Sequence, residues 1–198
     1  MSTRLTALAH QLLRAHLAPG DTAIDATTGN GHDTLMLAQC VGAKGRVFGF
    51  DVQPAALDST RNRLQHATAL QQVTLLLRSH AELASALGEY GMETTRAAVF
   101  NLGYLPGSDK HITTLTPSTL SALEQSLQLL DIDGVLLVMA YRGHPAGAEE
   151  SAHIEQWMQD QARRWQVRRR CAANNGPILY ALHKTAADKT TAVIGTID

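Results

Sequence analysis

Cysteine is scarce in this chain, and the few residues present form no recognisable motif. Its two cysteines, Cys40 and Cys171, lie far apart, and neither belongs to a Cys-x-x-Cys pair. A disulfide framework needs more cysteines, and a structural zinc site needs closely spaced ligands. We therefore expect a protein of a reducing compartment, the cytoplasm, with no bound metal.

An excess of charge and long apolar runs are also missing. The formal net charge is −1, so the overall charge does not indicate a nucleic-acid partner. No apolar run approaches the roughly 18 residues that a membrane helix needs, and the N-terminus begins an amphipathic helix rather than a signal peptide. With 198 residues, 44% of them hydrophobic, we expect one soluble domain over residues 1–198 with a full core.

The pattern of apolar residues predicts helices and strands that alternate along the chain. Apolar residues at helical spacing predict a first helix within residues 1–18, ended by Pro19-Gly20. Beyond it, predicted strands and helices alternate, which favours a mostly parallel, doubly wound α/β sheet. The strands are expected over residues 22–25, 46–51, 73–77, 97–101 and 135–140, and the helices over 33–40, 54–66, 82–87, 116–130 and 149–163.

The C-terminal part follows a different pattern. Two strands, 165–171 and 178–183, have only a turn between them, so we expect an antiparallel hairpin within residues 164–184. A hairpin at this edge distinguishes a methyltransferase-type sheet from an ordinary dinucleotide-binding fold. The polar tail from about residue 185 is expected to be loosely held.

A glycine-rich turn follows the first predicted strand. Residues 24–33 read Ile-Asp-Ala-Thr-Thr-Gly-Asn-Gly-His-Asp, which places the turn between a buried strand and a helix. Such a turn brings backbone close to a ligand at a helix N-terminus. The next strand ends in Asp51, about twenty residues further on, where a carboxylate can accept both hydroxyls of a ribose. Together these features predict a nucleoside cofactor.

His32 and Asp33 bear on which cofactor it is. A dinucleotide site normally has a third glycine where the pyrophosphate lies against the helix, and this chain has a bulky, negatively charged pair there. A carboxylate suits a cationic or zwitterionic ligand better, such as S-adenosylmethionine. An oxidoreductase that uses NAD is the alternative from another class.

Ligands of open α/β sheets lie beyond the carboxyl ends of the strands. The segments expected there are 25–33, 51–53, 79–80, 101–107 and 141–145. The candidate cofactor-binding residues from these segments are Asp25, Thr27, Gly29, Asn30, Gly31, Asp33, Asp51, Gln53, Ser79, His80 and Asn101. The candidate substrate-binding residues at the same edge of the sheet are Leu102, Tyr104, Lys110, Tyr141 and His144.

The loop that begins at Asn101 suggests chemistry on an amine. The Asn101 side chain and the Leu102 carbonyl can accept the two hydrogens of an amine and aim its lone pair at a methyl group. Tyr104 can stack on a planar ring or shield a sulfonium. An aliphatic amine must first lose a proton, and His80 and His144 are the candidate bases. The predicted catalytic residues are therefore Asn101, Tyr104 and His144.

Several of the candidate residues also have a purely structural interpretation. Asp25 can anchor the turn through backbone N–H groups instead of touching a ligand. Asn101 suits an ordinary turn, His144 can be a structural loop residue, and Lys110 can be solvated rather than bound to phosphate. The arginine-rich segment 163–170 can bind an RNA backbone, although alternation favours a solvated edge strand. His10 and His16 are expected at the surface.

Three segments carry a family resemblance. Residues 25–33, 101–110 and 141–147 together resemble the rRNA-methylase-like class I methyltransferases, and most of all the MnmM-type tRNA methyltransferases. The resemblance implies S-adenosylmethionine as methyl donor and a Rossmann-like seven-stranded sheet with a reversed last strand. It also implies methylation of 5-aminomethyl-(2-thio)uridine to 5-methylaminomethyl-(2-thio)uridine at the wobble position of the tRNA anticodon loop. Ser108 departs from the family pattern, where a second glycine is expected.

The resemblance also implies roles for individual residues. Gly29, Gly31, Asp33, Asp51, Ser79, His80 and Asn101 would line the donor pocket. Asn101, Tyr104, Tyr141 and His144 would face the acceptor. A methyltransferase for another RNA or a small amine, and a non-catalytic nucleoside-binding protein, are the other functions compatible with the sequence. A homodimer is the candidate assembly for extending a tRNA-binding surface.

Overall fold

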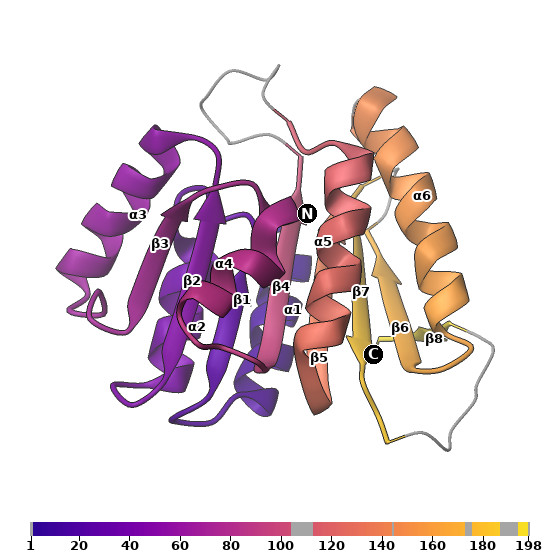
Figure 1. The fold of residues 1–198 in the computed structure, drawn as a ribbon. Helices are drawn as coiled ribbons and strands as arrows, with labels where there is room; N and C mark the ends of the chain where they lie inside the picture. The colour runs from indigo at the N-terminus through magenta and orange to yellow at the C-terminus, as the bar shows by residue number, and fades with distance from the viewer. Residues whose placement is uncertain (1, 104–112, 144, 173–175, 187–193, 198) are drawn as a thin grey trace.

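In a computed structural model, the chain forms a central sheet with helices on both faces (Figure 1). The structure describes residues 2–103, 113–143, 145–172, 176–186 and 194–197. The helices are α1 (Ser2–His16), α2 (His32–Val41), α3 (Pro54–His66), η1 (His80–Glu82), α4 (Leu83–Glu89), α5 (Thr116–Leu129) and α6 (Pro145–Gln161). The strands are β1 (Thr22–Asp25), β2 (Arg46–Asp51), β3 (Val73–Leu77), β4 (Thr95–Leu102), β5 (Leu130–Ala140), β6 (Gln166–Cys171), β7 (Ile178–His183) and β8 (Gly195–Thr196).

The strand order is β3-β2-β1-β4-β5-β7-β6-β8. The first five strands pair in parallel, and β7 runs antiparallel to both of its neighbours, β5 and β6. β6 and β7 are joined by a short connection, and β7 is inserted between β5 and β6. The prediction of a mostly parallel Rossmann-like sheet with a C-terminal antiparallel hairpin is confirmed.

Within the described residues the sheet has eight strands, one more than the expected seven. Residues 195–196 form β8, which pairs in parallel with β6. The neighbouring Ile197 is buried, and its backbone N–H donates to the Arg169 carbonyl at 3.0 Å. Part of the tail that we expected to be loosely held is thus fixed, because the outer side of β6 offers unpaired backbone groups and an apolar contact.

Two other boundaries differ from prediction. β5 begins at Leu130, ahead of the expected residue 135, because Leu130 pairs with Thr95 before a register shift. α6 begins at Pro145 rather than Glu149, since proline is well tolerated in the first turn of a helix.

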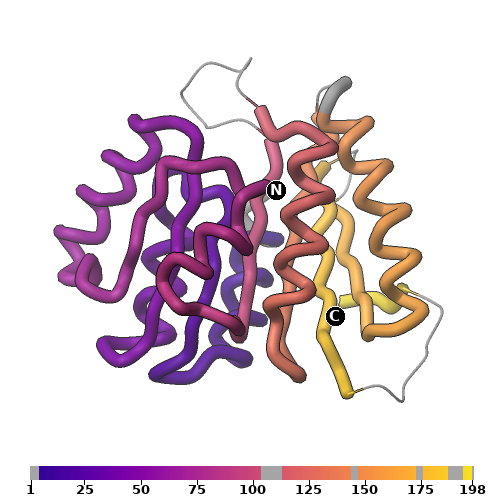
Figure 2. Tube along the Cα trace, in the orientation of Figure 1, coloured from indigo at the N-terminus to yellow at the C-terminus, as the bar shows by residue number. Residues whose placement is uncertain are grey.

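Both faces of the sheet are covered by hydrophobic cores. On the face seen in Figure 2, α4, α5 and α6 pack on aromatic side chains of the strands, including Phe48, Phe100 and Tyr180. On the other face, α1, α2 and α3 contribute Leu13, Leu37 and Leu64. Because both faces are buried, the central strands are almost continuously apolar, and the polar side chains at their carboxyl ends stand out from this pattern.

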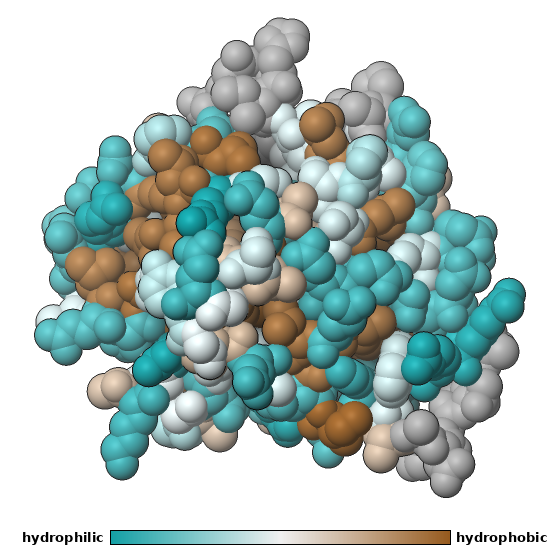
Figure 3. Space-filling view, in the orientation of Figure 1, coloured by the Kyte–Doolittle hydropathy of each residue, from teal (hydrophilic) through white to brown (hydrophobic). Residues whose placement is uncertain are grey.

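The surface is uneven between the two ends of the sheet. Polar surface predominates over α6, while hydrophobic surface gathers near the β2–β3 side of the molecule (Figure 3). The exposed large apolar side chains include Val52 and Leu77, which lie at the carboxyl ends of β2 and β3. In the part of the chain that the structure describes, no helix is both long and apolar enough to span a bilayer.

Candidate functional site

The glycine-rich turn connects β1 to α2 and packs closely against α3. Gly29 and Gly31 have positive φ values of 52° and 76°, a region that glycine adopts without steric cost. A Cβ at Gly31 would lie 2.9 Å from the Thr60 Cα, which belongs to α3. The Thr60 hydroxyl donates to the Gly29 carbonyl at 3.0 Å. The second glycine therefore allows α3 to hold the turn in place.

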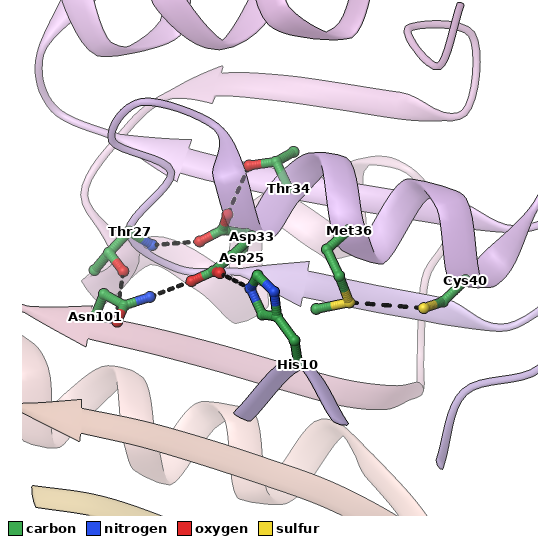
Figure 4. A network of polar contacts seen from close by, with 8 residues as sticks. All are labelled: His10, Asp25, Thr27, Asp33, Thr34, Met36, Cys40 and Asn101. Atoms are coloured by element: carbon green, nitrogen blue, oxygen red, sulfur yellow. Dashed lines mark hydrogen bonds and ion pairs between the residues drawn. The ribbon is translucent and has the colours of Figure 1, made fainter. Parts of the chain in front are cut away.

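Asp25, the last residue of β1, holds this turn through hydrogen bonds. The carboxylate is fully buried and accepts from the Thr34 hydroxyl at 2.6 Å and from the Thr27 backbone N–H at 3.2 Å (Figure 4). Burial, followed by the charge of Asp33, raises the pKa of Asp25 to about 7. These contacts match the turn-anchoring interpretation of Asp25.

Asp51 connects the turn to the end of β2. One carboxylate oxygen accepts from the Gly29 N–H and the other from the Gln53 N–H, each at 2.9 Å. A carboxylate oxygen can accept more than one hydrogen bond, so both oxygens retain capacity for ribose hydroxyls. Asn30, at the tip of the turn, accepts from the Ser59 hydroxyl at 3.3 Å with its side chain and from the Arg63 guanidinium at 2.7 Å with its carbonyl.

Asp33 and Asn101 meet where α2 begins and β4 ends. The Asn101 side-chain NH₂ donates to one Asp33 oxygen, and the Asn101 backbone N–H donates to the Thr27 hydroxyl at 2.7 Å (Figure 4). With its NH₂ engaged, the Asn101 amide still has its carbonyl oxygen as an acceptor. The predicted residues Thr27, Asp33 and Asn101 are thus brought together in one hydrogen-bonded group.

The expectation that His10 lies at the surface is wrong. His10 Nε2 lies 2.5 Å from the second Asp33 oxygen, and the His10 side chain is only 20% exposed. His16, which was expected beside it at the surface, is also partly enclosed: its Nε2 is buried, and its ring packs edge-on against His183. The helical pattern of α1 could not reveal these neighbours, because both come from distant parts of the chain.

Ser79 and His80 follow the end of β3. The Ser79 hydroxyl accepts from the Ala81 N–H at 3.2 Å and caps the short helix η1. His80 is 9% exposed, its Nδ1 lies 3.3 Å from the Ala26 carbonyl, and its ring packs on Phe100. Burial lowers the pKa of His80, so the imidazole is neutral at pH 7.

A second buried carboxylate, Glu150 of α6, was not identified from the sequence. Its two oxygens accept from the hydroxyls of Thr114 and Thr119, each at 2.6 Å. The Thr114 N–H donates to the Gly103 carbonyl at 3.0 Å, and the Thr114 hydroxyl accepts from the Gly103 N–H at 3.1 Å. Glu150 thereby fixes the residues on both sides of segment 104–112. The two threonines precede Glu150 by 36 and 31 residues in the sequence. Such distant residues form no recognisable motif.

The remaining acceptor-side residues are only partly described. Tyr104, Lys110 and His144 lie outside the described residues. Leu102 is buried and pairs with Ala140, and Tyr141 is partly buried against the α1-side core. Leu102 ends β4, and Tyr141 directly follows the neighbouring strand β5, so both lie at the same edge of the sheet as Asn101.

The arginine-rich segment lies away from this group. Its strand, β6, lies between β7 and β8 rather than at the edge. Arg169 pairs with Glu155 at 2.7 Å, and Arg170 donates to the Ile197 carbonyl at 2.7 Å. The side chains of residues 168–171 are exposed, as a solvated strand requires, but the expectation of an edge strand is wrong because β8 pairs with the outer side of β6. Within the described ranges, no group of three or more histidine, cysteine, aspartate or glutamate side chains forms a candidate metal site.

Comparisons with known proteins identify the family of the chain. Residues 47–182 match the model of the family described as "Putative rRNA methylase". A chloroplastic tRNA (mnm(5)s(2)U34)-methyltransferase of Arabidopsis thaliana is 37% identical over 77% of this chain and 58% of its own length, so the chain spans little more than half of that relative.

Solved structures show the same fold. The structure of a protein described as a "putative rRNA-methylase" from Clostridium thermocellum has a TM-score of 0.84 and 35% identity, covering 90% of this chain and 96% of its own. A protein from Streptococcus mutans described as a "putative methyltransferase", solved in complex with SAH, has a TM-score of 0.78 and 33% identity, covering 90% of this chain and 97% of its own. The chain therefore belongs to the rRNA methylase family and has the Rossmann-like fold of S-adenosylmethionine-dependent methyltransferases.

Proposed function

We propose that this protein is an S-adenosylmethionine-dependent tRNA N-methyltransferase that converts 5-aminomethyl-(2-thio)uridine to 5-methylaminomethyl-(2-thio)uridine at the wobble position. The observation that carries the proposal is the Asp33–Asn101 contact at the end of β4, which leaves an amide oxygen as an acceptor beside the glycine-rich turn. The identity of the chain to a tRNA methyltransferase named for this nucleoside supports the choice of substrate.

The residues around the turn fit the donor. Burial and, after it, repulsion from the charges of Asp33 and Asp51 raise the pKa of Asp25, because the three carboxyl groups lie close to one another. A ligand with a sulfonium and an ammonium group relieves this repulsion. Asp51 would accept the ribose hydroxyls, and the turn around Gly29 and Gly31 would let the ligand approach the backbone. The bound donor supplies a methyl group on a leaving group that is already cationic.

Residues at the end of β4 would prepare the acceptor amine. The Asn101 side-chain oxygen and the Leu102 carbonyl would accept the two amine hydrogens and point the nitrogen lone pair at the methyl group. Transfer to a neutral amine then requires positioning and exclusion of water more than further catalysis. The neutral imidazole of His80, or His144, would take the proton released before transfer.

Nucleoside mass spectrometry tests the proposal directly. We would incubate the protein and S-adenosylmethionine with tRNA that carries 5-aminomethyluridines and digest the tRNA to nucleosides. The expected result is a mass gain of one CH₂ unit on that nucleoside, with none in tRNA that lacks the aminomethyl group. No gain, with donor binding demonstrated by calorimetry, would contradict the substrate.

The formal net charge of −1 favours a second candidate, a methyltransferase for a small amine. Equal turnover of the free nucleoside and of tRNA would support this alternative. Donor binding without transfer to any acceptor would indicate a non-catalytic binding protein, and thermal stabilisation by NAD would indicate the oxidoreductase class.

The partner and setting follow from the proposed substrate. We propose the tRNA anticodon loop as the partner, a homodimer as the assembly that extends its binding surface, and the cytoplasm as the compartment. The related plant enzyme is chloroplastic, so the compartment is tested by localising the tagged protein. Light scattering with and without tRNA tests the dimer, and a monomer in both samples would contradict it.

A further inference from the structure

We propose that His10, on the N-terminal helix, is a positioning residue of the methyl-transfer site. It acts through Asp33 to hold the Asn101 amide with its carbonyl oxygen presented to the substrate amine. This inference rests on the proposed function and adds α1 to the functional machinery.

Three side chains from separate elements form one chain of contacts (Figure 4). His10 Nε2 contacts one oxygen of Asp33 at 2.5 Å, and the Asn101 NH₂ donates to the other. The two Asp33 oxygens are therefore held from opposite sides, by α1 and by the end of β4. A carboxylate fixed at both oxygens cannot rotate without breaking a charge-assisted hydrogen bond.

The surroundings strengthen these contacts. The side chains of His10 and Asp33 are only 20% and 12% exposed. Both, together with Asn101, line a cavity of about 10 Å³ whose other walls are mostly apolar, including Ala9, Leu13 and Met139. Hydrogen bonds in such a poorly solvated setting are stronger than in water and polarise one another. α1 is held over this group by its own buried residues, so His10 is not needed to attach the helix.

The orientation of Asn101 determines whether it can bind an amine. With its NH₂ toward Asp33, the amide offers an acceptor to the substrate; a flipped amide would offer a donor and repel the N–H groups. Losing His10 frees Asp33 to rotate, which releases Asn101 from its required orientation. Misplacing a positioning group can lower turnover about 100-fold, while donor binding through Asp51 is untouched.

The experiment compares two substitutions at position 10 with a control on the same helix. His10→Leu keeps the apolar bulk and removes the donor, whereas His10→Gln places an amide N–H where Nε2 lies. Gln11→Ala is the control, because Gln11 is exposed on α1. We expect His10→Leu to lower kcat about 10- to 100-fold with SAH affinity within about twofold, His10→Gln to recover most of the loss, and Gln11→Ala to match the wild type.

A second readout does not depend on activity. In ¹⁵N-labelled protein without ligand, the side-chain NH₂ signals of Asn101, assigned by their loss in Asn101→Asp, should shift and exchange faster with water in His10→Leu, but not in Gln11→Ala. Unchanged Asn101 signals, or kcat and SAH affinity falling together with the melting temperature, would overturn the positioning role. If the wild type transfers no methyl group to tRNA, the proposed function fails, and the Asn101 signals still decide the role of His10.

Discussion

Two carboxylate clusters lie on either side of the end of β4, and they are built differently. On the α2 side, Asp33 is held between the amide of Asn101 and the imidazole of His10. On the α6 side, Glu150 takes one threonine hydroxyl on each oxygen. The Glu150 contacts are all made within the fold, whereas Asn101 retains an acceptor oxygen for a ligand. The first cluster can therefore bind a ligand, and the second stabilises the fold.

Both clusters act on the same short stretch of chain. Asp33 orients the side chain of Asn101, and Glu150 holds Thr114 against the backbone of Gly103, two residues further on. Substitutions in the two clusters should separate the two roles, since one set should change turnover or ligand affinity and the other the stability of the fold.

Asn101→Ala should have the largest effect. Removing one preorganised hydrogen-bonding group at a reacting centre lowers kcat about 10²- to 10³-fold in comparable sites. Steady-state kinetics with modified tRNA would measure the loss, and calorimetry should show SAH affinity within about threefold. Normal turnover in this variant would remove Asn101 from the mechanism.

Asp51→Ala should weaken donor binding without a matching loss of turnover at saturating donor. Hydrogen bonds to a charged group contribute about 1.5–3 kcal/mol, so the Kd for SAH should rise roughly 10- to 100-fold. Isothermal calorimetry measures this, with Asp58→Ala, an exposed residue of α3, as control. An unchanged Kd would exclude the ribose contact.

Glu150→Gln should destabilise the fold. A glutamine amide is uncharged and has one acceptor oxygen, so one of the two threonine hydroxyls exchanges its bond to a carboxylate for a weaker contact with an NH₂ group, at a cost of about 1–3 kcal/mol. Chemical denaturation measures this loss, and SAH affinity should stay within about twofold. A loss of SAH affinity with full stability would assign Glu150 to the donor site and abolish the distinction between the clusters.

The last prediction concerns pH. The pKa of Asp25 is raised from 3.8 to about 7, so the folded protein binds a proton there that the unfolded chain has lost. The stability contributed by Asp25 is complete below pH 3.8 and is lost as pH rises through about 7. The ¹³Cγ signal of Asp25 should titrate near pH 7 without ligand and at lower pH with S-adenosylmethionine, because a nearby cation favours the carboxylate. An Asp25 signal that titrates near pH 4 without ligand would contradict the effect of burial, and of the neighbouring Asp33 charge, on this carboxyl group.

Much of the fold was predictable from the sequence. The bounds of β2, α3, β3 and β7 match the predicted ranges, because strong hydrophobic periodicity and clear turn residues surround each of these elements. β8 was missed because a two-residue strand has no periodicity. It exists because β6 offers a free edge and Ile197 finds an apolar contact.

The placement of candidate site residues was predictable wherever a motif contained them. The turn glycines, Asp33, Asp51 and Asn101 could be placed together because each stands at the carboxyl end of a predicted strand or the start of the helix that follows, and their roles stay predictions. His10 and Glu150 were not, since each lies on the side of a helix, and its neighbours are 23 to 36 residues away in the chain.

The sequence by itself determined the strand–helix alternation, the reversed hairpin and the placing of polar residues at the strand ends, because these depend on local periodicity and turn chemistry. Only the tertiary structure decided that α1 brings His10 to Asp33 and that α6 brings Glu150 to Thr114. The physical reason is that hydrogen bonds between elements depend on how the helices pack across the sheet. The pattern of residues along the sequence does not show which distant residues come close together after folding.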